Sequence, residues 1–207
     1  MIANTVLVPF LCAAGTALAA PAPVLDSATY CRRDPANPQG CLAFDIQPSA
    51  VVLHDTHWSG QNTCNPPAGC HVAKATTNNG HDITTMLTFT YPPAVQGRQC
   101  WLAFNLPTGA TVSPATGAQV DVFKQWQPVS GCPSQGNNRD VHLGRMNVPS
   151  VAGGVGTWAA TYNAHLTAAG PCPAPGTVEG IEIVGVGDNE DVAWQQGAGV
   201  GVKIVYS

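Results

Sequence analysis

The segment Ile83–Tyr91, with the sequence ITTMLTFTY, carries the clearest pattern in this chain. One set of alternating positions, which includes Leu87 and Phe89, is mostly apolar, and the other set is mostly threonine. Alternation of apolar and polar residues is typical of a β-strand with one buried face and one solvated face. The segment therefore predicts a half-buried strand.

Short apolar runs separated by turn residues surround this strand. Pro92, Pro93 and Gly97 predict a turn, and Cys100 to Phe104 predicts a second strand that pairs with the first or lies next to it. Further predicted strands are 50–54, 119–126, 157–162, 178–184 and 200–206. No segment has the period of a long amphipathic helix. This spacing predicts an all-β fold, an antiparallel β-sandwich of about seven to nine short strands with disulfides.

The chain begins with an apolar segment, Ile2 to Ala20, that ends in small residues before Pro21. This pattern predicts a secretory signal peptide over residues 1–20. Residues 21–46 predict a Cys- and Pro-rich N-terminal extension, and residues 47–207 predict the β-sandwich domain. No later stretch approaches the ~20 continuous apolar residues of a membrane span. We therefore expect a secreted protein, either extracellular or in a cell wall.

The cysteines fit the same compartment, because cysteines of secreted proteins usually form disulfides. Cys12 leaves with the signal peptide. We expect three disulfides among the other cysteines, which pair Cys31 with Cys41, Cys64 with Cys70, and Cys100 with Cys172. The first two couples are close in sequence and close small loops, and the third closes a long one. Cys132 is then the odd cysteine, either buried or in an intermolecular bridge.

The charge of the chain excludes one class of partner. The formal net charge is −4, and the 8 Lys and Arg residues are scattered rather than gathered in a stripe. Nucleic-acid-binding proteins carry a clustered basic surface. We therefore expect no nucleic-acid partner.

The region from Leu87 to Pro107 contains an apolar strand, a Pro-bearing turn and a cysteine followed by Leu, Phe and Pro. In this order, and together with Pro171-Cys172-Pro173 and the closing Val202 to Tyr206, it resembles the fungal ubiquitin-3-binding-protein C-terminal domain family, the But-type domain. The resemblance covers roughly Gln47 to Ser207. It implies a fungal extracellular or cell-wall protein and carries over no catalytic residues. The family name also implies a different role, that of an intracellular protein-binding adaptor.

Two groups of residues are candidate metal ligands. His54 and His57, with Asp55 between them, bring imidazole and carboxylate ligands suited to copper or zinc, and the alternative is an exposed loop with solvated histidines. The second group, Asp188, Glu190 and Asp191, lies in a predicted turn. Its carboxylates either form part of a calcium shell or are solvated groups of a hairpin turn. No cofactor is expected, because neither group completes a ligand set.

Two glutamates and three tryptophans are further candidates for catalysis and for binding. Glu179 and Glu182 are expected on opposite faces of one strand, which opposes an acid–base pair. The nucleophile and zinc-protease motifs are missing from the sequence. The tryptophans Trp58, Trp126 and Trp194 are possible platforms for sugar rings, and the alternative is burial in the core.

The sequence therefore favours a secreted, non-enzymatic structural or surface-binding protein whose partner is a cell-wall polysaccharide or an extracellular protein. The alternative is an extracellular metal-dependent hydrolase that uses His54 and His57 or the turn at 188–191.

Overall fold

The computed structural model describes residues 44–56, 61–132 and 138–207. The predicted signal peptide, nearly all of the N-terminal extension, Cys31, Cys41, His57 and Trp58 lie outside these residues. No helix within the described residues is long and apolar enough to cross a membrane.

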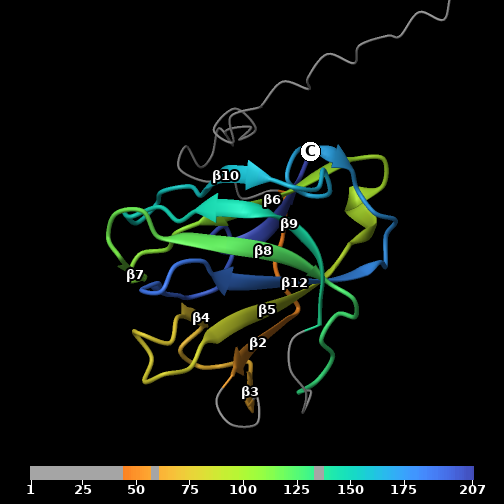
Figure 1. The fold of residues 1–207 in the computed structure, drawn as a ribbon. Helices are drawn as coiled ribbons and strands as arrows, with labels where there is room; N and C mark the ends of the chain where they lie inside the picture. Colours follow the sequence, from red (N-terminus) through yellow and green to blue (C-terminus); the bar gives the residue numbers. More distant parts are fainter. Residues whose placement is uncertain (1–43, 57–60, 133–137) are drawn as a thin grey trace, which may run out of the picture.

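The described chain is built almost entirely of antiparallel strands, which form two sheets (Figure 1). The four-stranded sheet has the order β1 (Asp45–Ile46), β14 (Gly201–Tyr206), β6 (Gln99–Asn105) and β11 (Gly170–Pro171). The main path of the larger sheet is β10 (Thr157–Thr161), β9 (Arg139–Asn147), β8 (Gln119–Gln125), β12 (Val178–Gly185), β5 (Ile83–Thr90), β4 (Cys70–Ala73), β13 (Asp191–Trp194) and β7 (Thr111–Ser113). Beside this path, β2 (Ala50–Asp55) pairs with β5 and with β3 (Gln61–Cys64). The predicted antiparallel, sandwich-like all-β fold is confirmed.

The two sheets share one hydrophobic core. Leu87 and Phe89 of β5 belong to the same buried cluster as Phe104 of β6 and Ile204 of β14. Burial of these side chains between two sheets supplies the main stabilising term of such a fold. The apolar positions of β5 that predicted a strand are therefore buried on the core side of the sheet.

Of the two arrangements predicted for β5 and the following strand, pairing or lying next to each other, pairing is not found. The chain makes a 3-10 turn, η2 (Pro93–Val95), and passes from the larger sheet to β6 in the smaller one. Pro92 and Pro93 have no backbone N–H and cannot extend the ladder. β5 instead pairs with β12, β2 and β4, and it meets β6 across the core.

The prediction of a half-buried β5 is wrong, because both faces of this strand are covered. Thr84, Met86 and Thr88 on the second face, hereafter the outer face, are all buried. Met86 forms a second, small apolar cluster with Val52 of β2 and with Val129, which lies in the segment after β8. The threonines of this face are satisfied by hydrogen bonds instead of by solvent.

The strand count is higher than the predicted seven to nine, since the described residues contain fourteen strands. Six of those that the sequence analysis did not predict have two to four residues, which is too short to show a period. The longest strand of the fold, β9, was missed as well. Its register shifts against β8 between Val122 and Phe123, and such a bulge breaks the alternation of its side chains.

Two disulfides lie within the described residues. The predicted bridge between Cys100 and Cys172 is confirmed. The predicted bridge between Cys64 and Cys70 is wrong, because Cys64 is bonded to Cys132 and Cys70 is a free, buried thiol. Cys132 is accordingly not the odd cysteine.

The physical reason for this difference is that Cys64 and Cys70 lie on opposite sides of the larger sheet. Cys64 packs against the small outer cluster, whereas Cys70 is part of the main core. Burial raises the pKa of the Cys70 thiol to about 12, so this thiol stays protonated at neutral pH.

Candidate functional site

Of the candidate histidine site, the structure describes His54 and Asp55. His54 lies in β2 and is buried, with Nδ1 at 2.8 Å from Oδ1 of Asn62 on the paired strand. The alternative of a solvated His54 in an exposed loop is therefore wrong. The next residue, Asp55, forms an ion pair of 2.6 Å with Nδ1 of His81.

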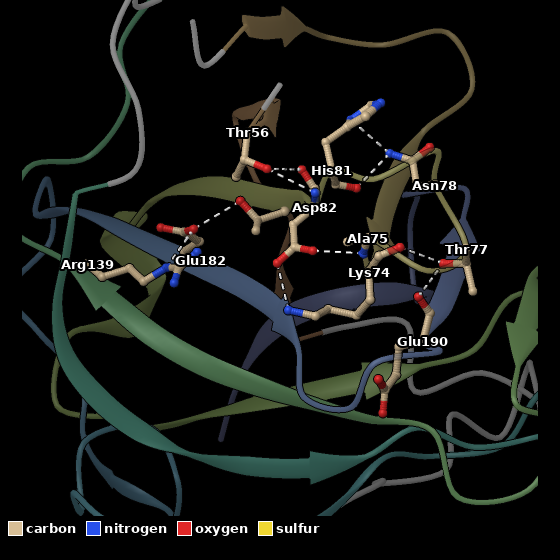
Figure 2. Close-up of polar contacts among 11 residues, drawn as sticks. Thr56, Lys74, Ala75, Thr77, Asn78, His81, Asp82, Arg139, Glu182 and Glu190 are labelled. Carbon is tan, nitrogen blue, oxygen red and sulfur yellow. Dashed lines mark hydrogen bonds and ion pairs between the residues drawn. The ribbon is translucent and has the colours of Figure 1, made fainter. Parts of the chain in front are cut away.

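The acidic turn also spreads its side chains apart. Asp188 is exposed, whereas Asp191 is paired through Oδ1 with Nε2 of His71 at 2.9 Å. Glu190 is buried, and its carboxylate points away from the loop that carries Thr77 (Figure 2). In the part of the chain that the structure describes, no three His, Cys, Asp or Glu residues form a group able to hold a metal ion.

The loop before β5 is held by one aspartate. Asp82 accepts hydrogen bonds through Oδ2 from Nζ of Lys74 at 2.6 Å and through Oδ1 from the backbone of Ala75 at 2.8 Å (Figure 2). Its backbone N–H donates to the hydroxyl of Thr56 at 2.9 Å. These contacts give Asp82 a role in closing the loop.

The two glutamates of β12 lie on opposite faces of the sheet, as expected. Glu179 is on the core side, only 4% exposed, and accepts hydrogen bonds from Tyr91 and His165, each at 2.6 Å. Lys124 lies 3.3 Å from the same carboxylate. Burial alone would raise the pKa of Glu179, but the hydrogen bonds from His165 and Tyr91 and the charges of His165 and Lys124 outweigh it, and the pKa is lowered.

Glu182 is on the outer face and fully buried. Its Oε1 accepts hydrogen bonds from Thr84 and from Nε of Arg139, both at 2.9 Å, and the latter contact is visible in Figure 2. Its Oε2 has no hydrogen-bond partner among the described residues. Burial raises the pKa of Glu182, and the charge and hydrogen bond of Arg139 only partly offset this effect.

These opposite shifts predict opposite pH dependences for two matched variants. The carboxylate of Glu179 stabilises the fold above its unfolded pKa of about 4.3, and this stabilisation is lost as the pH falls through its lower folded value. We expect Glu179→Gln to cost about 2 kcal/mol at neutral pH, the scale of hydrogen bonds to a buried charge, and progressively less in acid. Urea unfolding between pH 3 and 7 measures the difference.

Glu182→Gln is the control, because its folded pKa is raised. The ionised form of Glu182 is disfavoured in the folded state, and acidification relieves this cost. The wild type should therefore gain stability relative to Glu182→Gln as the pH falls. A pH-independent difference for Glu179→Gln, or the same trend in both variants, would contradict this account.

The three tryptophans singled out in the sequence differ in the structure. Trp126 follows β8 and is 73% exposed, so it is available as a platform. Trp194 is 2% exposed, packs against Phe104 with the ring centroids 5.0 Å apart, and donates through Nε1 to Gln196. Of the two interpretations of Trp194, burial in the core is the one that the structure shows, so this indole is not a platform. Trp58 lies outside the described residues.

A row of planar side chains crosses β8 and β9. The ring of Phe123 stacks on His142 with centroids 4.3 Å apart, and His142 contacts the ring of Tyr162 at 4.7 Å. The guanidinium of Arg139 lies 5.4 Å above the ring of Phe123. Tyr162 is 58% exposed. We call Phe123, His142 and Tyr162 the aromatic row.

Two polar rows lie beside the aromatic row on the same face. Arg145 donates to both oxygens of Asp121, at 2.8 and 3.0 Å. Farther along, Gln119 donates to Asn147 at 2.8 Å, and Asn147 donates to the hydroxyl of Thr157 at 3.3 Å. Alternation places Gln119, Asp121 and the aromatic row opposite the core side of β8.

The three rows together form one surface, which we call the β8–β10 face. It offers flat rings, paired carboxylate and guanidinium groups and side-chain amides within three adjacent strands. Rings of this kind accept apolar faces of a ligand, and the polar groups can bind hydroxyls. The sequence analysis did not find this face, because its residues come from strands that only the register of β9 brings together.

A comparison with known proteins finds no family model that matches the chain and no significant match among curated proteins. The resemblance to the But-type domain therefore stays a prediction.

Proposed function

We propose that this is a secreted, non-catalytic surface-binding β-sandwich, and that its β8–β10 face binds polysaccharide chains of a cell wall. The observation that carries the proposal is the aromatic row, in which Tyr162 is exposed and Phe123 and His142 are half-buried, together with the exposed indole of Trp126 at the end of β8. Aromatic side chains at a surface can serve as binding anchors, because they offer a large apolar area with a polar edge. The hydroxyls of a sugar can bond to Asn147 and Asp121, while its C–H faces lie on the rings.

The compartment is part of the proposal. Two disulfides support an oxidising environment, since disulfides are rare in reducing compartments. The apolar segment at residues 2–20 supports secretion. The metal-dependent hydrolase has less support, because His54 and Asp191 are held by protein partners in the structure.

Tyr162→Ala tests the proposed face. The purified protein is incubated with insoluble chitin, β-1,3-glucan and cellulose, and its depletion from solution is measured. We expect saturable depletion by at least one of them, and about a tenfold loss of affinity in Tyr162→Ala, as for the loss of about 1.4 kcal/mol at a binding hot spot.

The matched control is Phe44→Ala, which removes an exposed aromatic ring that packs against Tyr206 of the other sheet. Its affinity should equal that of the wild type. Equal losses in Phe44→Ala and Tyr162→Ala, or no depletion by any of the three polysaccharides, would overturn the proposal.

A further inference from the structure

Residues 126–132, which we call the strap, leave the end of β8 and run over the outer face of the larger sheet. Figure 1 shows this segment passing from β8 toward β3. The Cys64–Cys132 disulfide joins its far end to β3. The strap thus crosses from one part of the larger sheet to another without pairing as a strand.

Few contacts other than the disulfide hold the strap. Val129 is its one buried residue and packs against Val52 and Met86. The backbone carbonyl of Val129 accepts a hydrogen bond from the hydroxyl of Thr88 at 2.8 Å. The strap residues 127 and 130–132 are exposed.

The closed strap also covers polar atoms that lack partners. Gln125 is 2% exposed, and neither Oε1 nor Nε2 has a hydrogen-bond partner among the described residues. A Cβ on Gly180 would lie 2.2 Å from Oε1 of Gln125 and 2.9 Å from Cα of Pro128, so the amide is enclosed between β12 and the strap. Glu182, two residues along β12, has an unpartnered Oε2. Buried polar groups without partners favour any state that hydrates them.

We propose that the strap is a redox-released cover, closed while the Cys64–Cys132 disulfide is intact and open when it is reduced. The reductant is a dithiol. It transfers two electrons and two protons to the disulfide, which becomes two cysteine thiols, and the dithiol itself is oxidised to a disulfide. Opening hydrates Gln125 and uncovers an apolar patch formed by Val52 and Met86. This inference does not depend on the proposed function.

The placement of the two disulfides makes the release selective. Cys132 is exposed at the end of the strap and its partner Cys64 is half-buried, whereas Cys100 is 2% exposed in the core and its partner Cys172 is half-buried. Thiol exchange requires access to a sulfur atom. A mild dithiol should therefore reduce the Cys64–Cys132 bridge first and leave the Cys100–Cys172 bridge intact.

Three measurements on the full-length secreted protein test the proposal. Alkylation followed by mass spectrometry should label Cys64 and Cys132 before Cys100 and Cys172. Hydrogen exchange of residues 126–132 should then become at least about tenfold faster, while the ladder between β5 and β12 keeps its protection. Nuclear Overhauser contacts between the methyl groups of Met86 and Val129 should disappear.

The variant Gln125→Met distinguishes release of the strap from a general loss of stability of the fold. It replaces an unpartnered amide with an apolar side chain of similar length, so the closed state no longer buries those polar atoms. We expect the reduced Gln125→Met protein to keep the Met86–Val129 contact that the reduced wild type loses. Retention of the contact in the reduced wild type, loss of the β5–β12 ladder, or prior reduction of Cys100–Cys172 would overturn the proposal.

Discussion

Replacing Cys100 and Cys172 together by alanine should lower the free energy of unfolding by about 4 kcal/mol. The bridge joins residues 72 positions apart, and a loop of that length gives about this value in the chain-entropy account of disulfides. The link is also structural, because it ties β6 to the segment after β11, where the backbone N–H of Cys172 bonds to Arg98. Denaturant unfolding of the oxidised proteins measures the change.

The control for this pair is Cys70→Ala. Cys70 is fully buried and makes no disulfide, so its substitution removes one packed sulfur and the 3.9 Å contact of that sulfur with Oε1 of Gln196. We expect a cost of about 1 kcal/mol from this small cavity. If Cys70→Ala were as destabilising as the double substitution, packing of the sulfur atoms and not the covalent link would explain the result.

Trp194→Ala is the second substitution with a large expected effect, about 3–5 kcal/mol. The indole fills the core beside Phe104, and its Nε1 donates to Oε1 of Gln196, which also accepts from the backbone of Val202. Loss of the ring leaves a cavity and weakens this buried polar contact. Thermal and denaturant unfolding give the magnitude.

Trp126→Ala is the matched variant, since it removes the same side chain from an exposed position. Its stability should stay within about 0.5 kcal/mol of the wild type, because the ring is 73% exposed. Its polysaccharide binding should fall instead. The opposite pattern, a stability loss in Trp126→Ala and a binding loss in a folded Trp194→Ala, would contradict the assignment of the two tryptophans.

These two residues show what the sequence could and could not predict. Trp126 ends the predicted strand 119–126, whereas Trp194 lies between the predicted strands 178–184 and 200–206. A period-two pattern does not say whether either position is covered by another part of the chain. Trp194 lies at the end of β13, which pairs with β4 and β7, and its side chain is part of the main core. Trp126 begins the strap, where no strand pairs with it.

Local patterns predicted most of the longer strands, because alternation within β5 and β12 is a property of a few neighbouring residues. The pairing of strands depends on distant parts of the chain, and here the predictions failed. Cys64 was assigned to Cys70 because they are neighbours in sequence, whereas its partner, Cys132, is 68 positions away. The β8–β10 face was missed for the same reason, since its rows join residues 119 to 162 through the register of β9.

The partners of the two buried glutamates could not be predicted from the sequence pattern either. The sequence placed Glu179 and Glu182 on opposite faces of β12, and the structure agrees. Alternation assigns a face but not a partner. His165 reaches Glu179 from the segment between β10 and β11, and Arg139 reaches Glu182 from β9.

The central claim is that the β8–β10 face binds a glycan chain, and chemical-shift mapping tests it most directly. The labelled protein is titrated with soluble oligosaccharides of chitin, β-1,3-glucan and cellulose. The account predicts saturable shifts in the aromatic row, in Trp126 and in Asn147, with the resonances of Phe44 and Tyr206 on the other sheet unchanged. Shifts centred on the other sheet, or no shifts with any of the three, would contradict it.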